Sequence, residues 1–318
     1  MKLKTGFISV ILLWPVIFIQ CSGNDNMSDN GTGRIALDIT DAPSDDGNIQ
    51  GTFVTVSKVK IDNQEVKGFT KQTIDISAFR NGETKLLFNE AMDAKSYKSV
   101  TLVFDYDSDD SGNSPGCYVL TDDNHKHRLA ASSENEGEVT LSKTIDVEKD
   151  STTNLLIDFE LRKAIVRDSV NQDNSQYKFV SSDEMGNAFR LVYEDSCGEV
   201  SGHVSQSVNI TGDTYIFIYR KGEFDAPAET QGQGGSGVLF ANAVSSTKVN
   251  QDGSYRLSFL NKGEYEIHPA TFEKDENEKV MYKGMINATS TVSGLLLDNV
   301  TVAAGSQLQL NIDILGLI

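Results

Sequence analysis

Residues 154–166, with the sequence NLLIDFELRKAIV, constrain the fold more than any other stretch of this chain. Every second residue from Leu155 to Leu161 is apolar, which places those side chains on one face of an extended strand. The other face carries one apolar and three charged residues: Leu156, Asp158, Glu160 and Arg162. Such alternation is typical of a β-strand with one buried face. We therefore predict a central strand here, with a bend near residues 162–163.

Short alternating segments recur along the rest of the chain, separated by clusters of Gly, Asn, Asp and Ser. No window keeps a 3.6-residue period, so long helices are not expected. Short strands at regular spacing indicate an all-β fold built as antiparallel sandwiches. The predicted strands are residues 34–40, 53–61, 73–76, 86–88, 97–106, 117–120, 127–131, 139–147, 155–161, 177–180, 188–193, 198–206, 215–219, 255–259, 264–269, 280–288, 291–302 and 307–314.

Two tandem β-sandwich domains are predicted from the length and from a restart of the strand pattern. The chain has 318 residues, enough for two cores of ordinary size. The pattern restarts near residues 196–198, so we assign residues 34–197 to the first sandwich and 198–318 to the second. The glycine-rich segment at 231–237 (QGQGGSG) predicts an exposed, mobile loop in the second domain.

The N-terminal segment has the layout of an export signal. Lys2 and Lys4 precede an apolar run at residues 7–19, which is shorter than the ~20 residues that span a bilayer. We predict a signal peptide over residues 1–20. Residues 22–33 are almost entirely polar or glycine and cannot form a core, so we expect a flexible tether before the first domain.

Cys21 directly follows the apolar run and precedes small and polar residues. This arrangement resembles the signal of bacterial lipoproteins, in which the cysteine becomes the acylated first residue of the mature protein. The resemblance implies a lipid anchor at Cys21, a tether over residues 21–33, and a place at the cell outer membrane, facing the surface or the periplasm. Phe18 and Gln20 depart from the usual motif, which has leucine and a small residue there. A short uncleaved anchor is the alternative.

The charge balance narrows the choice of partners. Lys and Arg number 28 against 46 Asp and Glu, which gives a formal charge of −18. Nucleic-acid binders need clustered basic residues to meet the phosphates, so we exclude nucleic acid as a partner. The anchor makes the membrane one expected partner, and an envelope protein or a glycan stays open as another. The sequence leaves the oligomeric state open.

Two cysteines remain outside the N-terminal segment, Cys117 and Cys197. They lie far apart and lack the CxxC spacing that would indicate a zinc site or a redox motif. Because exported proteins commonly carry disulfides, we predict a Cys117–Cys197 disulfide. Two free thiols are the alternative.

An acidic run at residues 105–113 is the best candidate for a metal site. Asp105, Asp107 and Asp109 have the spacing with which a calcium-binding EF-hand loop begins. The run lacks the glycine and the glutamate that an EF-hand has at its sixth and twelfth positions, so a solvated hairpin loop is the stronger interpretation. No cofactor is expected.

Asp158 and Glu160 are a pair of carboxylates whose spacing suggests catalysis. On one strand face they stand ~6.6–7 Å apart, near the separation of acid–base pairs in glycoside hydrolases. Arg162 continues the same face and one strand alone forms no cleft, so a polar sheet face is the preferred interpretation. The sequence also lacks GxSxG, HExxH, P-loop and GxGxxG motifs. We predict no catalytic residue.

Two family resemblances cover most of the chain. Residues 33–195 resemble the domain of unknown function 4382 of exported bacterial proteins, through LDITDAPSDD (37–46), VTVSKVKI (54–61), TIDISAF (73–79), SYKSVTLVF (96–104) and NLLIDFELRKAIV (154–166). That family implies no activity, and Glu160 and Ala164 stand where its pattern favours Asp and Ser. Residues 198–318 resemble a carboxypeptidase-regulatory-like or Cna-B-like domain of transthyretin type, chiefly through DGSYRLSFLNKGEYEI. This second resemblance implies a scaffold rather than a function.

Together these features predict a non-catalytic, lipid-anchored envelope protein that serves as a binding or assembly module for an unknown ligand. A fimbrial (pilus) subunit or adhesin is the alternative, in which Arg34 would be a processing site before a removable strand at residues 35–40. A glycoside hydrolase that uses Asp158 and Glu160 ranks third.

Overall fold

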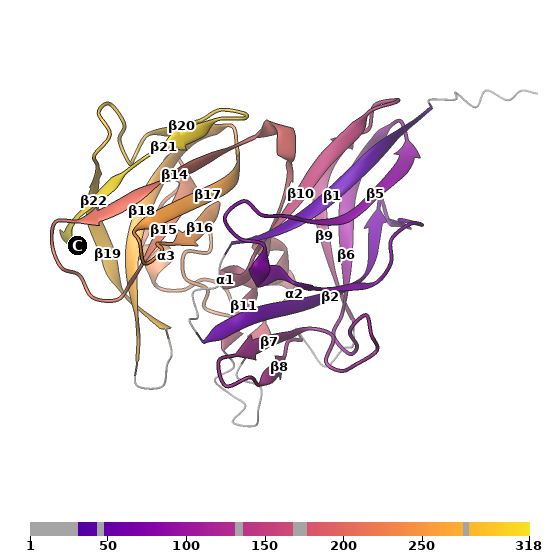
Figure 1. The fold of residues 1–318 in the computed structure, drawn as a ribbon, viewed down its shortest axis with the longest axis horizontal. Helices are drawn as coiled ribbons and strands as arrows, with labels where there is room; N and C mark the ends of the chain where they lie inside the picture. The colour runs from indigo at the N-terminus through magenta and orange to yellow at the C-terminus, as the bar shows by residue number, and fades with distance from the viewer. Residues whose placement is uncertain (1–30, 43–47, 131–135, 168–176, 276–279) are drawn as a thin grey trace, which may run out of the picture.

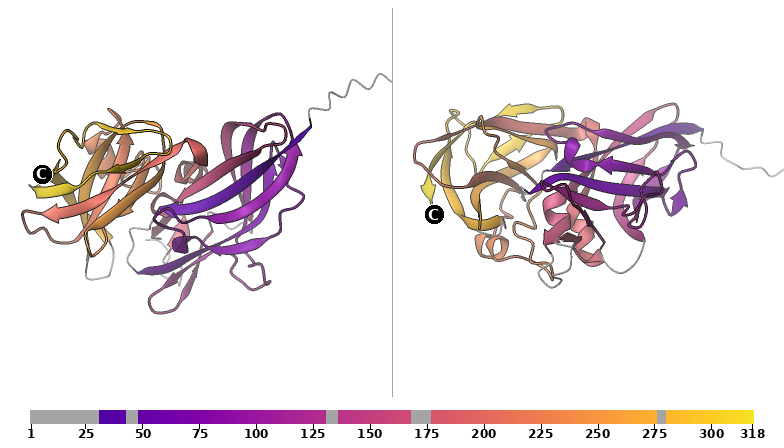
Figure 2. Two further views of the ribbon diagram at one scale, coloured as in Figure 1. Left: turned by 45° about the horizontal axis from the view of Figure 1, so that its top comes forward. Right: turned by 60° about the horizontal axis from the view of Figure 1, so that its bottom comes forward.

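The structure is a computed structural model that describes residues 31–42, 48–130, 136–167, 177–275 and 280–318. Two β domains lie side by side along the long axis of the molecule (Figure 1). We call the described residues up to 196 the first domain and those from 197 onward the second. Strand β1 (Thr32–Ala42) begins at the outer end of the first domain, and the C-terminus lies at the opposite end of the molecule (Figure 2).

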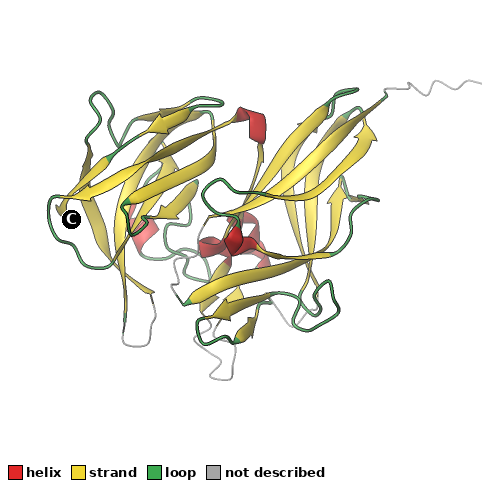
Figure 3. Ribbon diagram, in the orientation of Figure 1, coloured by secondary structure: helices red, strands yellow, loops and turns green. Residues whose placement is uncertain are grey.

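Strands dominate both domains, and the described helices are short turns (Figure 3). This confirms the predicted all-β fold class. The remaining elements of the first domain are β2 (Ile49–Ile61), β3 (Gln64–Glu65), β4 (Gln72–Asp75), η1 (Ile76–Ala78), β5 (Lys85–Asp93), β6 (Ser96–Asp105), β7 (Tyr118–Thr121), β8 (Lys126–Arg128), β9 (Glu136–Asp146), β10 (Thr152–Glu160), α1 (Leu161–Ala164), β11 (Ile165–Arg167), β12 (Tyr177–Phe179), α2 (Ser182–Met185), η2 (Gly186–Ala188), β13 (Phe189–Tyr193) and η3 (Glu194–Ser196).

Two main sheets face each other in the first domain. One has the order β13-β10-β1-β5, and the other has the order β8-β7-β2-β6-β9, with β3 and β4 also paired to β2. β10 lies between β1 and β13, as expected for a central strand. β1 and β10 run parallel, whereas an antiparallel arrangement was predicted throughout. The chain between them, which includes β2 to β9, forms the crossover that a parallel pair requires.

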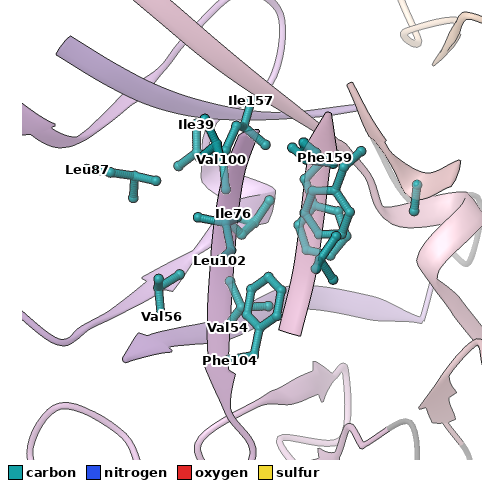
Figure 4. Close-up of a cluster of buried hydrophobic side chains, with 14 of the residues drawn as sticks. Ile39, Val54, Val56, Ile76, Leu87, Val100, Leu102, Phe104, Ile157 and Phe159 are labelled. Atoms are coloured by element: carbon teal, nitrogen blue, oxygen red, sulfur yellow. The ribbon is translucent and has the colours of Figure 1, made fainter. Parts of the chain in front are cut away.

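The core of the first domain fills the space between these sheets. The predicted alternation in β10 is confirmed, because Leu155, Ile157 and Phe159 all point into this core. Figure 4 shows Ile157 beside Ile39 of β1, and the ring centre of Phe159 lies 6.3 Å from that of Phe104 in β6. The Phe159 ring stacks on a ring of β13, Phe189, with centroids 4.1 Å apart.

The second domain follows the first almost directly, because only η3 separates β13 from β14. Its elements are β14 (Cys197–Gln206), β15 (Asp213–Arg220), α3 (Ala226–Thr230), β16 (Ser245–Lys248), β17 (Ser254–Asn261), β18 (Gly263–Lys274), β19 (Val280–Ser290), β20 (Val300–Val302), β21 (Gln307–Gln309) and β22 (Ile312–Leu317). These strands join in the order β16-β15-β18-β19-β22-β14-β17, with β20 on β18 and β21 on β14. The sheet curls around a core that includes Val200, Ile216, Leu257, Ile267 and Ile312.

The sequence prediction was less accurate near the C-terminus. A single strand was predicted over residues 291–302, but only β20 (Val300–Val302) is a strand there. The last predicted strand, 307–314, is two short ones, β21 and β22. Both pair in parallel with β14. β16, which had no alternation to reveal it, was missed.

The structure contradicts the predicted disulfide, because Cys117 and Cys197 are both free thiols. Cys117 lies in the core of the first domain, with its sulfur 3.4 Å from the Thr55 amide. Cys197 belongs to a separate cluster with Leu156 and Val192, on the other face of the β10 sheet. A disulfide needs two Cα atoms within about 7 Å, so thiols on opposite sides of a sheet cannot pair.

None of the described helices is long and apolar enough to cross a membrane. The predicted signal peptide (1–20), the lipidated Cys21 and most of the tether lie outside the described residues.

Truncation of Phe159 should reveal how much the first domain depends on β10. The ring is fully buried against Phe104 and Phe189, so Phe159→Ala should lower the free energy of unfolding by about 3–5 kcal/mol. Leu86→Ala on β5 of the same sheet is the control, because Leu86 is half exposed and should change stability by only about 0.5 kcal/mol. Urea unfolding followed by circular dichroism measures both, and equal effects would contradict the packing described.

The free thiols can be counted directly. In a Cys21→Ser variant denatured without reductant, two thiols should react with a thiol reagent. In the native protein both should react slowly, because both are buried and burial raises the pKa of Cys117 to about 12. A count of zero after denaturation would restore the disulfide.

Candidate functional site: a charged cluster between the domains

The outer face of β10 is covered by the second domain. On this face, Leu156 packs with Val192, Cys197 and Phe259. Next come Asp158 and Glu160, which are only 3% and 1% exposed. The sequence predicted a polar, solvated sheet face at this place. The structure instead buries these carboxylates, so each needs a partner within the protein.

Asp158 finds its partner on the neighbouring strand. Arg190 of β13 stands opposite Asp158 in the antiparallel pair and donates a hydrogen bond to its carboxylate. The same guanidinium donates a second hydrogen bond, 2.7 Å long, to the main-chain carbonyl of Phe259 in β17. Arg190 thereby neutralises a buried acid and binds the second domain at once.

The predicted bend near residues 162–163 is the single helical turn α1, which follows β10 directly. The turn aims two cations at the second domain. Arg162 donates hydrogen bonds to the carbonyls of Leu239 and Phe240, the latter at 3.0 Å, and its guanidinium lies 5.0 Å from the centre of the Phe217 ring. Lys163 donates a hydrogen bond of 2.5 Å to the carbonyl of Ala243. Both side chains are more than nine-tenths buried.

Glu160 completes the contact from the first domain. Its carboxylate lies 4.0 Å from the Arg162 guanidinium and accepts a hydrogen bond of 3.4 Å from the Ser246 hydroxyl of β16. Burial raises the pKa of Glu160, and the nearby Lys163 ammonium opposes that rise. Burial likewise lowers the pKa of Lys163 to about 8, against the attraction of Glu160.

The contacts that the second domain makes with Arg162, Lys163, Arg190 and Glu160 are main-chain carbonyls, one hydroxyl and one aromatic ring. Three of the four carbonyls belong to residues 221–244, the segment between β15 and β16. The ionisable groups therefore come from the first domain, and the second domain supplies acceptors that depend on backbone shape more than on side-chain identity.

A buried carboxylate, Glu229, holds that segment in shape. It is 1% exposed and accepts hydrogen bonds from the Tyr219 hydroxyl at 2.8 Å, from the side chain of Gln233 at 2.7 Å and from the side chain of Asn242 at 2.6 Å. Glu229 thus joins α3 to Gln233 and Asn242, which lie on either side of the two residues whose carbonyls accept from Arg162. Glu229 was not predicted as a structural residue, because a single acid among polar residues matches no known sequence motif.

The glycine-rich loop itself contacts the first domain. Ser236 donates hydrogen bonds of 3.0 Å and 2.6 Å, from its amide and its hydroxyl, to Glu184 of α2. Burial raises the pKa of Glu184, but hydrogen bonds from Ser236 and Ser181 outweigh burial and lower it to about 2. Val238 inserts into the core of the first domain. The loop predicted to be exposed and mobile is therefore tied to the first domain at Ser236 and Val238, whereas Gly234 and Gly235 are exposed as predicted.

Asp41, near the end of β1, belongs to the same cluster but lacks hydrogen-bond partners for its carboxylate. It is 6% exposed, and neither carboxylate oxygen has a hydrogen-bond partner. The amide of Leu161 approaches it without reaching hydrogen-bond geometry. Burial raises the pKa of Asp41 well above its usual range, and the charges of Asp158 and Glu160 raise it further.

The cavity beside Asp41 and Asp158 is small. Its volume is about 20 Å³, and residues of both domains line it, including Thr40, Ser246 and Phe259. Such a volume holds about one water molecule and no sugar ring. The geometry therefore gives Asp158 and Glu160 roles in joining the domains.

The calcium candidates lie away from this cluster, in the loop after β6. Asp105 forms an ion pair of 2.8 Å with Lys71 and accepts hydrogen bonds from the amides of Asp107 and Ser108. Asp109 accepts hydrogen bonds from the amides of Ser111 and Asn113. These carboxylates shape their own loop, and an ammonium group already lies beside Asp105. Among the described residues no group of three or more acidic, histidine or cysteine side chains is arranged to hold a metal.

Residues 32–181 match the family described as "Domain of unknown function (DUF4382)". This matched segment contains Asp41, Asp158, Glu160, Arg162 and Lys163, and the match bears out the resemblance found from the first-domain motifs. Arg190 lies beyond it. No curated protein matches the chain.

Solved structures that include a pilin subunit and a collagen-binding surface protein show a distant likeness. The major pilin subunit of Bacillus cereus is 10% identical, with 89% of this chain and 70% of that chain covered and a TM-score of 0.20. A B repeat unit of the collagen-binding surface protein of Staphylococcus aureus is 9% identical, with 90% and 98% covered and a TM-score of 0.19. The chain spans only 34% of the Bacillus anthracis TIE protein, at a TM-score of 0.18. Scores this low carry no argument about fold or function.

Loss of the Arg162 guanidinium should uncouple the domains. Arg162→Met leaves two carbonyls without their donor and Glu160 without the neighbouring Arg162 charge, which should cost about 3–5 kcal/mol of unfolding free energy. Arg256→Met removes an exposed pair with Glu199 and should cost less than about 1 kcal/mol. Urea unfolding measures both values. Equal, small losses would show that the contact does not hold the domains together.

The contribution of Asp41 to the free energy of unfolding should fall as pH rises. An unfolded aspartate titrates near pH 4, and the folded protein holds the Asp41 proton more tightly. The folded state therefore gains from the proton at low pH, and this gain is lost as pH rises from about 4 through the raised pKa. Asp41→Asn should raise stability at pH 8 by about 1–3 kcal/mol and reduce the slope. Exposed Asp122→Asn should do neither, and an unchanged Asp41→Asn curve would refute the burial argument.

Proposed function

We propose that this protein is a non-catalytic, lipid-anchored envelope module, in which two β domains are docked as one rigid unit for binding or assembly. The observation that carries the proposal is the charged cluster on β10, α1 and β13. Its side chains bind the second domain through Arg162, Lys163 and Arg190.

The state of the two carboxylates supports a non-catalytic role. A glycosidase needs an acid and a base that both reach the substrate. Asp158 is bonded to Arg190 and Glu160 to Ser246, and the second domain covers both. A glycoside hydrolase therefore remains the third candidate function.

The ends of the molecule suit an anchored module. β1 begins at the outer end of the first domain, so a tether attached there would place the second domain farthest from the membrane (Figure 1). Because Cys21 precedes β1 by about ten residues of tether, lipidation there would present the second domain outward. We propose the cell outer membrane as its location.

A pilus subunit or adhesin is the second candidate. In the version with a removable first strand, cleavage after Arg34 would make Ile35 the new N-terminus, and residues 35–40 of β1 would then have to leave the sheet. β1 lies between β5 and β10, and Ile35, Leu37 and Ile39 are fully buried in the core. Removal of such a strand would empty the core, so an intact adhesin fits better than a strand-exchanging subunit.

The anchor can be tested by fractionation. The wild-type protein should stay with the membrane after a carbonate wash, because two or more acyl chains give stable anchoring. Cys21→Ser should move it to the soluble fraction, while Ser22→Ala, one position away, should leave it bound. A Cys21→Ser variant that remains with the membrane would refute lipidation as the anchor.

A further inference from the structure

A groove lies where the two domains meet, and residues of both domains line it. Its volume is about 400 Å³, within the range of about 300–1,000 Å³ typical of small-ligand sites. The first domain lines it with Arg80 and Asn81, which follow η1. The second domain lines it with the ends of β14 and β15 and with residues 247–251. Asn81 and Thr247 also line the small cavity beside Asp41, so the groove lies next to the charged cluster.

The lining of the groove is polar. It is rich in amide and charged side chains, with one aliphatic residue, Val249, and no aromatic ring. The amide side chains are Asn81, Gln206, Asn250 and Gln251. Amides both donate and accept hydrogen bonds, which suits a ligand with many hydroxyl groups. An apolar peptide side chain would find little surface to bury here.

One cation in the groove is available to a ligand. Lys248 forms an ion pair with Asp213 at 2.6 Å, so its charge is met within the protein. Arg80 is exposed and forms no hydrogen bond or ion pair through its guanidinium with any described residue, although Asp41 and Asp75 are near enough to feel its charge. A planar guanidinium binds an acid group through two parallel hydrogen bonds.

We propose that this groove binds an anionic saccharide, with its acid group on Arg80 and its hydroxyl groups on the surrounding amides. This proposal rests on the proposed function, because it names the class of ligand that the non-catalytic module would bind. Asn81 supports the arrangement, because its left-handed backbone (φ 58°) sets the turn that carries Arg80 over the groove. The ligand bridges the domains, since Arg80 belongs to the first and most of the amides belong to the second.

Binding is tested on the full chain with Cys21→Ser, so that the result does not depend on the membrane anchor. Calorimetric titration uses three probes: trigalacturonate with carboxylates, glucose 6-phosphate with a phosphate, and the uncharged galactotriose. At least one acidic probe should bind about tenfold or more tightly than galactotriose, the value expected for one charge-assisted contact. The tighter acidic probe identifies the acid group.

Two variants assign the contact to Arg80. Arg80→Gln should weaken binding of the acidic probe about tenfold, while its melting curve changes little, because the guanidinium makes no hydrogen bond or ion pair with a described residue. Arg256→Gln removes the same charge outside the groove and should change affinity less than about twofold. Lack of binding by both acidic probes, or equal binding in Arg80→Gln, would overturn the ligand class. Cleavage of trigalacturonate, seen by mass spectrometry, would instead overturn the non-catalytic function.

Discussion

The arrangement of the two domains depends on the buried guanidinium of Arg162. A buried charge is stable only where hydrogen bonds and counter-charges replace water, so Arg162 needs Glu160 and the carbonyls of Leu239 and Phe240 in place at the same time. Those carbonyls face α1 only while the segment that follows β15 keeps its shape. Glu229 holds that shape from within the second domain. The Arg162 guanidinium thus makes the position of the second domain depend on the conformation of the segment that follows β15.

The two domains contribute different kinds of groups to this interface. The first domain supplies the ionisable groups, whereas the second supplies mainly carbonyl oxygens, whose positions follow from backbone shape. Hydrogen bonds are directional, so the cluster selects one orientation, which apolar packing of Leu156 against Phe259 alone would not do. A fixed orientation also preserves the interdomain groove, because Arg80 and the facing amides belong to different domains.

The sequence predicted well what depends on neighbours along the chain. The alternation in β10 correctly assigned Phe159 to the core, and the bend after it is α1. Interactions between distant segments were not predictable in this way. The solvated face expected for Asp158 is covered by a domain that begins about forty residues later, and the glycine-rich loop contacts the first domain through Glu184. Cys117 and Cys197 show the same limit, because spacing along the chain does not reveal that a sheet separates them.

Residual dipolar couplings of backbone amides, measured on the intact chain, test most directly whether the domains form one rigid body. Couplings from the sheets of both domains should fit a single alignment tensor, with the relative orientation that places Arg162 against Phe240. Two tensors of clearly different magnitude would mean that the domains move independently, which would contradict a docked unit held by the charged cluster.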